Sequence, residues 1–195
     1  NCKRRILLWF MNVLDFCLKI DNVIPDIICD ELIKIFEESD NKGRLERAGY
    51  PNWTNLFLED YHDGGMIQNK IDDQSQSILQ AYQKYLGEYG KYFDSNDVRY
   101  EGANIKCYVG GTEDRYGYHA DVSSMSTSLR YVAMIWYLND DFDGGETVFY
   151  PDCVVKPKKG SVLVFPPFWM FPHCGKPVLE GKKYIMSTYC LWSHG

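Results

Sequence analysis

Two segments in the first half of the chain carry apolar residues at helical spacing. Residues 25–39 begin with Pro25, which suits a first helical turn, and we predict a helix there. Residues 72–92 form a second amphipathic pattern, and we expect the tyrosines of this helix to pack in the core. A short, partly alternating run over residues 15–20 predicts a strand, whereas residues 40–70 have weak periodicity. The apolar positions of the two predicted helices are Ile24, Ile27, Ile28, Leu32, Ile35 and Phe36, then Ile78, Leu79, Tyr82, Tyr85, Leu86 and Tyr89.

The second half of the chain has short apolar runs separated by polar turns. The runs are ANIKCYV, LRYVAMIWYL, ETVFY, SVLVF and KYIMSTYCLW, and the turns include VGGTEDRYG, NDDFDGG, KPKKG and LEGKK. Short strands with long returns favour a sandwich or jelly roll over a parallel sheet. We therefore predict an α+β fold in a single domain over residues 1–195. Flanking N-terminal helices are expected over about residues 15–95 and a jelly-roll core over about residues 100–192.

The composition is that of an ordinary globular domain with an acidic balance. The 195 residues are 45% hydrophobic and 25% charged, the net charge is -6 and the pI is about 5.2. A protein that binds the phosphate backbone of nucleic acid carries a basic stripe, so we expect no nucleic-acid partner.

Cysteine usage and the N-terminal segment bear on the compartment. The seven cysteines include no C-x-x-C pair, which argues against a structural zinc site, and their odd number argues against a full disulfide framework. NCKRRILLWFMNVL resembles the start of a signal peptide, but Asn12 and Asp15 interrupt it and it is too short to span a bilayer. We expect no membrane segment in this chain and a cytoplasmic location, or the lumen of the endoplasmic reticulum if an upstream signal was removed.

A histidine and an aspartate stand two positions apart in YGYHADVS. On a strand, His119 and Asp121 project from the same face, and together they could form two corners of a metal site. A surface hydrogen bond between the two side chains is the simpler alternative. The chain has four histidines, and we expect His62 and His194 to be solvated.

The remaining histidine, His173, lies among aromatic residues in FPPFWMFPHCGKP. A histidine in such surroundings is either a hydrogen-bonded core residue or a metal ligand. Two histidines and one carboxylate form the ligand set of non-haem Fe(II) oxygenases. A zinc hydrolase can use the same ligands, so the triad alone does not select the metal.

A lysine ten residues after His173 supplies the next candidate. If the strand that begins at Lys183 lines a cavity, its ammonium requires an anion, because an unpaired buried charge is costly. A dicarboxylate that chelates the metal at one end would supply this anion at the other. In the alternative interpretation, Lys182 and Lys183 are both solvated residues of a turn.

From about residue 15 onward, the chain resembles the Fe(II)- and 2-oxoglutarate-dependent dioxygenases, in particular the prolyl 4-hydroxylase branch. The stretches that carry the resemblance are IDNVIPDIICDELIKIFEES, CYVGG, HAD, YLNDDFDGGETVFYP, KPKKGSVLVFPP and PHCGKPVLEGKKYIMSTY. Each is weak alone, but their order and spacing are specific. The resemblance implies a double-stranded β-helix core and hydroxylation with O2, Fe(II) and 2-oxoglutarate, with ascorbate as an accessory reductant.

The resemblance also implies roles for individual residues. His119, Asp121 and His173 would hold iron and act as the catalytic triad, and Lys183 would bind the distal carboxylate of 2-oxoglutarate. The other co-substrate positions would be Tyr108, Thr147 and Tyr137, with barrel core as the simpler interpretation of the last two. Arg130 matches an arginine near the substrate mouth.

The chain also departs from this family in two places. Relatives carry a Trp and a His two positions apart on the last strand, where this chain has Tyr189 and Leu191, and the stretch TEDRYGY replaces a shorter loop. The expected partner is a peptide or protein that contains proline. The alternatives are the same chemistry on a free amino acid or other small molecule, and a jelly-roll module that binds without catalysis.

Overall fold

The computed structural model of the chain describes residues 13–46, 52–93 and 95–193. The basic and apolar segment over residues 1–12, and His194, lie outside the described residues. None of the helices in the described ranges has the length and apolar character that a membrane crossing requires.

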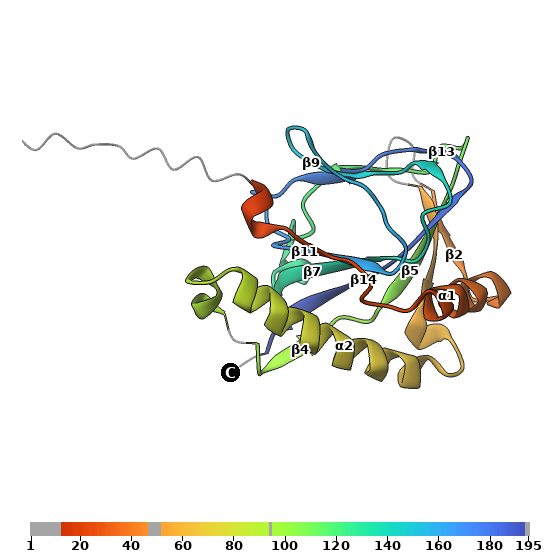
Figure 1. Cartoon of the computed structure of the whole chain (residues 1–195). Coiled ribbons are helices and arrows are strands. Elements are labelled where there is room, and N and C mark those ends of the chain that lie inside the picture. Colours follow the sequence, from red (N-terminus) through yellow and green to blue (C-terminus); the bar gives the residue numbers. More distant parts are fainter. Residues whose placement is uncertain (1–12, 47–51, 94, 194–195) are drawn as a thin grey trace, which may run out of the picture.

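The core consists of antiparallel strands in two facing sheets and one small two-stranded pair (Figure 1). The large sheet has the order β1 (Leu18–Ile20), β11 (Ser161–Phe165), β7 (Arg130–Tyr137), β14 (Lys182–Trp192), β5 (Asn104–Val109), β3 (Trp53–Phe57) and β2 (Gly43–Leu45), and β4 (Val98–Tyr100) also pairs with β14. The small sheet has the order β10 (Cys153–Val155), β9 (Thr147–Phe149), β12 (His173–Gly175) and β6 (Tyr116–His119). The remaining pair is β13 (Val178–Glu180) with β8 (Asp143–Gly144). This arrangement confirms the predicted double-stranded β-helix.

The long strand β14 shows how the large sheet separates two interiors. Successive side chains of a strand point to opposite faces. Tyr184 and Met186 belong to the hydrophobic cluster shared with the helices. Lys183 and Ile185 point to the other face and line a cavity between the two sheets. The period of two therefore places the functional side chains and the helix-facing core on one strand.

Two helices cover the outer face of the large sheet, as Figure 1 shows for α1 (Asp26–Glu38) and α2 (Gly64–Tyr85). Helix α1 buries Cys29, Leu32 and Phe36. Four short 3-10 helices complete the described elements: η1 (Val13–Phe16), η2 (Leu58–Asp60), η3 (Tyr89–Tyr92) and η4 (Met125–Thr127). The prediction of flanking N-terminal helices on a jelly-roll core is confirmed.

Several predicted boundaries need correction. Helix α2 begins eight residues before the predicted start at residue 72 and ends at Tyr85. The tyrosine stripe is only partly core, because Tyr82 is 1% exposed while Tyr85 and Tyr89 are 46% and 55% exposed. Residues 40–70, where the periodicity is weak, contain β2, β3 and the start of α2. The run over residues 15–20 begins as a 3-10 turn and becomes a strand at Leu18.

Candidate metal and co-substrate site

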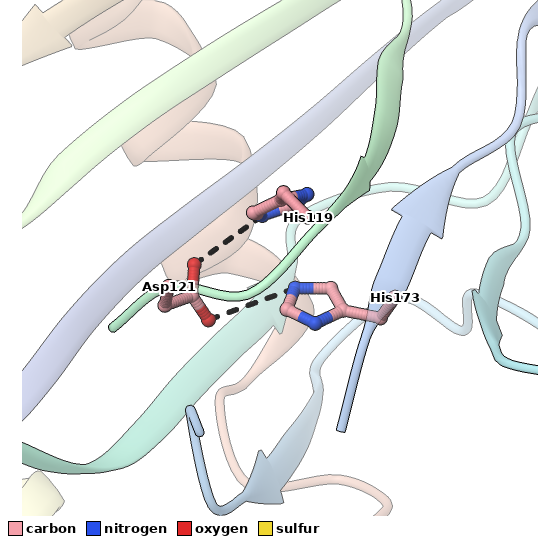
Figure 2. Close-up of side chains that lie close together, drawn as sticks. All are labelled: His119, Asp121 and His173. Atoms are coloured by element: carbon pink, nitrogen blue, oxygen red, sulfur yellow. Dashed lines mark ion pairs between the residues drawn. The ribbon is translucent and has the colours of Figure 1, made fainter. Parts of the chain in front are cut away.

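Three side chains that could ligate a metal converge at the end of the small sheet (Figure 2). His119 is the last residue of β6 and lies opposite His173, the first residue of β12. Asp121 Oδ1 is 3.3 Å from His119 Nε2, and Asp121 Oδ2 is 3.6 Å from His173 Nε2. One potential ligand atom from each residue lies within 4.8 Å of the others. The expected shared strand is wrong, because β6 ends at His119 and Asp121 follows it in a bend.

Hydrogen bonds fix the two imidazoles in the orientation a metal needs. The Nδ1 atom of His119 donates to the carbonyl of Gly117 at 2.9 Å, and the Nδ1 atom of His173 donates to the carbonyl of Phe171 at 3.1 Å. Each bond leaves the Nε2 lone pair directed at the space beside Asp121, as in metal-bound histidines whose other nitrogen is held by a carbonyl. The backbone thus selects the tautomer that can ligate.

Burial sets the charge of this cluster. Burial lowers the pKa of His173 to about 4, so its imidazole is neutral at physiological pH. The pKa of Asp121 is lowered to about 2, because its interactions with His119, His173 and Tyr189 outweigh the opposing effect of burial. The triad therefore presents two imidazole nitrogens and one ionised carboxylate, a set that suits Fe(II) and also Zn²⁺.

A buried lysine lies in the same cavity as the triad. Lys183 is 3% exposed, and its Nζ atom donates to the carbonyl of Gly145 at 2.6 Å. No ion pair to Lys183 exists among the residues that the structure describes. Burial lowers the pKa of this lysine to about 8. An ammonium with a single carbonyl partner, deep in a cavity, is a receptor for an anion. Lys183 is therefore not the solvated turn residue of the alternative interpretation.

The other predicted co-substrate residues surround this lysine. Its Nζ atom lies 5.7 Å from the ring centroid of Tyr108 and 5.7 Å from that of Tyr137. The hydroxyls of Tyr137 and Thr147 share a 2.7 Å hydrogen bond, and Thr147 lines the cavity. Burial raises the pKa of both tyrosines, so both stay neutral donors. The structure thus brings Tyr108, Tyr137 and Thr147 together with Lys183.

Arg130 lines the outer cavity, and other side chains hold its guanidinium. Its guanidinium forms a fork of two hydrogen bonds with the carboxylate of Glu101, one of them 2.6 Å long. It also lies 3.9 Å from the ring centroid of Tyr189. The Tyr189 hydroxyl in turn donates to Asp121 Oδ1 at 2.8 Å. Arg130 thus supports the ring of a tyrosine that orients the metal-binding carboxylate, and its guanidinium is already occupied by Glu101.

Three residues of the cavity were not found from the sequence: Tyr116, Trp53 and Lys106. The ring of Tyr116 stacks on His119 with centroids 3.6 Å apart, and the ring of Trp53 follows at 4.8 Å from Tyr116. Lys106 lies two residues before Tyr108 on β5 and lines the same cavity. The period of two from Tyr108 is the signal that could have revealed Lys106. His62, by contrast, is 70% exposed, as expected for a solvated residue.

An outer cavity of about 360 Å³ lies beside His119 and Asp121. Its wall includes Leu45 of β2, with Trp53 and Phe57 of β3. His119 and Asp121 belong to its floor, and Lys106 is shared between this outer cavity and the inner one around Lys183. The site therefore has an inner chamber beside the buried Lys183 and a wider outer chamber beside the partly exposed Lys106.

Residues 103–191 match the model of the 2OG-Fe(II) oxygenase superfamily. This segment contains all three residues of the triad and Lys183. No curated protein matches the chain closely enough to count as a relative.

Solved structures of low sequence identity share the fold. A collagen prolyl hydroxylase of Paramecium bursaria Chlorella virus-1, in complex with 2OG, is 22% identical with a TM-score of 0.65, and the match covers 92% of this chain and 97% of that one. A Pseudomonas putida prolyl-4-hydroxylase is 15% identical with a TM-score of 0.69, over 92% and 94% of the chains. A Trichoplax adhaerens prolyl hydroxylase in complex with a peptide fragment of a hypoxia inducible factor is 18% identical with a TM-score of 0.67, over 91% and 84%.

Proposed function

Because the chain is a 2OG-Fe(II) oxygenase, we propose that it hydroxylates prolyl residues, at the 4-position, in a peptide or protein. The observation that carries this proposal is the outer cavity beside His119 and Asp121, which is separate from the inner cavity around Lys183 and is walled by residues of β2 and β3. Its support is the shared fold with prolyl hydroxylases, one of which is described with a bound peptide fragment.

In this proposal His119, Asp121 and His173 hold the iron. The described side chains fit it, because both imidazoles present Nε2 and Asp121 is the ionised partner between them. When bound, Fe(II) would activate O2, and 2-oxoglutarate would supply two electrons on its decarboxylation to succinate and CO2, so that one oxygen atom of O2 enters a C–H bond of the substrate and the other enters succinate. Tyr189 holds the carboxylate of Asp121 in place through its hydroxyl.

Lys183 would bind the distal carboxylate of 2-oxoglutarate. Its ammonium has a carbonyl partner but no counter-charge in the described part of the chain, so a carboxylate would complete its environment. Tyr108, Tyr137 and Thr147 would line the co-substrate and exclude water from it, and the Thr147 hydroxyl is held by Tyr137. Exclusion of water strengthens the charge interaction, because the local dielectric constant is low.

The same chemistry on a free amino acid is the second candidate. It is favoured by Tyr189 and Leu191 in place of the Trp and His that some relatives carry, because Tyr189 is committed to Asp121 and Arg130. The turn over residues 110–115, which directly precedes the cavity residue Tyr116, is anchored by the ion pair between Arg44 and Asp114. Substrate size therefore has to be tested directly.

The test is succinate release from 2-oxoglutarate with Fe(II) and ascorbate, with and without a (Pro-Pro-Gly) repeat, poly-proline or free L-proline. Succinate release that rises with peptide, together with a gain of about 16 Da on proline, supports the proposal. If free proline alone stimulates succinate release, the second candidate, hydroxylation of a free amino acid, replaces the proposal. Slow succinate release with no response to any proline compound removes proline as the substrate, and the reaction class stands. The need for ascorbate is measured by leaving it out.

A further inference from the structure

A second lysine faces the cavity, apart from the one that the proposed function uses. On β5, Asn104, Lys106 and Tyr108 share one face, and the side chains between them pack toward the helices. Lys106 lies opposite Ile185 of β14, whereas Tyr108 lies opposite Lys183. Two residues of strand separate these pairs, which is about 7 Å. The two ammonium groups therefore lie at different depths in the site. Lys183 lines the inner cavity alone, whereas Lys106 lines both the inner and the outer cavity.

The charges around Lys106 are already committed elsewhere. Glu101 is taken by the fork to Arg130, and Asp121 is the carboxylate of the candidate metal site. In the part of the chain that the structure describes, Lys106 makes no hydrogen bond and no ion pair, and its nearest aromatic contact is Trp53, with Nζ 5.6 Å from the ring centroid. A divalent cation at the triad would outweigh the charge of Asp121 and leave Lys106 with a net excess of positive charge around it.

Other polar atoms in the same wall lack partners as well. Asn104 Oδ1 and Trp53 Nε1 are buried without a hydrogen-bond partner among the described residues, and both side chains line the outer cavity. Buried polar groups are nearly always satisfied, so a cluster of unsatisfied groups around a cation indicates a missing polar ligand. The site thus offers a cation and an unsatisfied donor, Trp53 Nε1, which suit a carboxylate, and an unsatisfied acceptor, Asn104 Oδ1, which suits an N–H group of the same ligand.

We propose that Lys106 forms an anion subsite that binds a carboxylate of the prime substrate, close to the carbon that is hydroxylated. The inference deepens the proposed function and rests on its reaction class. Two sources share this chemistry: an acidic side chain next to proline in a peptide, and the α-carboxylate of a free amino acid. A role in binding 2-oxoglutarate is assigned to Lys183 instead, because that lysine lies deeper, between Tyr108 and Tyr137.

The experiment compares carboxylates with their amides. Peptides that carry Glu or Gln beside proline form the first pair, L-proline and L-prolinamide form the second, and a panel of other L-amino acids with their amides forms the third. Turnover gives kcat/KM, and calorimetric titration without O2, in the presence of Fe(II) and 2-oxoglutarate, gives binding without chemistry. The proteins are the wild type, Lys106→Met, Lys106→Arg and the control Lys34→Gln, whose lysine is 70% exposed and lies on α1.

The wild type and Lys34→Gln are expected to prefer the carboxylate by roughly 10-fold or more in one of the pairs, both in binding and in kcat/KM, as for a charge-assisted hydrogen bond. Lys106→Met should remove the preference, Lys106→Arg should retain part of it, and KM for 2-oxoglutarate should stay unchanged. The pair that shows the preference identifies the source of the carboxylate.

Three results overturn the inference: equal binding of carboxylates and amides by the wild type, a KM for 2-oxoglutarate that rises in Lys106→Met while the preference persists, or no binding of any compound. Other results distinguish a failure of this subsite from a failure of the proposed prolyl hydroxylation. If the protein hydroxylates proline compounds without preferring carboxylates, the anion subsite is contradicted and prolyl hydroxylation stands. If a carboxylate preference that depends on Lys106 appears only with compounds that lack proline, prolyl hydroxylation is contradicted and the anion subsite stands.

Discussion

The ammonium of Lys183 donates a 2.6 Å hydrogen bond to the carbonyl of Gly145, inside a cavity that also holds a carboxylate and two histidines. Glycine at 145 has a φ of 67°, and a Cβ there would lie 3.1 Å from the Cδ atom of Lys183. The lysine side chain and the backbone therefore fit closely, and the direction of the ammonium is fixed before any co-substrate binds.

Lys183→Met is expected to raise KM for 2-oxoglutarate by roughly 30- to 150-fold, the equivalent of about 2–3 kcal/mol for a charge-assisted hydrogen bond. The melting temperature should stay equal or rise, because an apolar side chain of similar size replaces a buried charge. The matched control is Lys182→Met on the same strand, whose lysine points outward and pairs with Glu37. An unchanged KM in Lys183→Met would remove this lysine from the co-substrate site.

The affinity for 2-oxoglutarate should fall at alkaline pH. The pKa of Lys183 is lowered to about 8 in the free protein, so the ammonium that binds the carboxylate is present below this pH and lost above it. We expect kcat/KM for 2-oxoglutarate to be flat up to about pH 8 and then to fall by about tenfold per pH unit, since this ratio reports the free enzyme. Lys183→Arg should show no such fall, because a guanidinium stays charged. A flat profile in the wild type to pH 9.5 contradicts the assignment.

Asp121→Ala should abolish both iron binding and turnover. The variant loses the only negative charge of the triad and leaves two imidazole ligands. The measurement is iron content after anaerobic loading and gel filtration, with about one iron per chain expected for the wild type and almost none for the variant. Asp152→Asn, at an exposed position, is the control. Full activity in Asp121→Ala would contradict the assignment of Asp121 as a metal ligand.

Tyr189→Phe should weaken metal binding without unfolding the protein. The change removes the 2.8 Å hydrogen bond to Asp121 and keeps the ring against Arg130. Loss of such a supporting bond costs roughly 10- to 100-fold in metal affinity or activity. Metal dissociation constants from competition with a chelator measure this, with Tyr92→Phe at an 86% exposed site as the control. Equal affinities in all three proteins would show that Tyr189 does not position the carboxylate.

Arg44→Gln should lower stability in a way that depends on pH. Asp114 is 1% exposed and accepts hydrogen bonds from Arg44 and from the backbone N–H of Val109. These contacts lower the pKa of Asp114 against the opposing effect of burial, so their stabilisation is present above the unfolded pKa and lost as pH falls through the folded one.

We expect Arg44→Gln to lose about 1–2 kcal/mol of unfolding free energy at pH 7, a figure reduced because Arg44 is partly exposed. The difference from the wild type should shrink below about pH 3, where Asp114 is protonated in the unfolded state. Urea denaturation at both pH values measures this, and Arg115→Gln, whose side chain is 52% exposed, should stay within about 0.5 kcal/mol of the wild type. An equal deficit at both pH values excludes the ion pair as the cause.

Strong periodicity made the strands of the second half and helix α1 predictable. The start of α2 was missed because Gly64 and Gly65 are typical of turns. In the structure Gly64 begins a helix, and a Cβ there would lie 1.6 Å from the carbonyl oxygen of Leu58, so the position needs glycine for close packing. Strand β3 was missed because Asn55 interrupts its apolar alternation while lining the outer cavity.

Some features of the candidate site could likewise be predicted from the sequence, and others could not. The spacing of His119 and Asp121 and the apolar surroundings of His173 were visible in the sequence, and the structure brings all three together. The partner of Arg130 was not visible, since Glu101 lies 29 residues earlier and meets it only through the pairing of β4, β14 and β7. Lys106 looks like a solvated position in an apolar strand. Its spacing of two from Tyr108 indicates that the two residues share a face, and its register with β14 and β3 shows where on the sheet it lies.

Strand β6 lies at the edge of the small sheet and pairs, among the described strands, with β12 alone, through a ladder that contains an irregularity between His173 and Gly175. It carries His119 at its end. A metal held by His119 and His173 would tie the edge strand to its inner neighbour, as a cross-link does. Backbone amides of residues 116–119 should therefore exchange with solvent deuterium faster in metal-free protein than in loaded protein, while those of β14, which is paired on both sides, should change little.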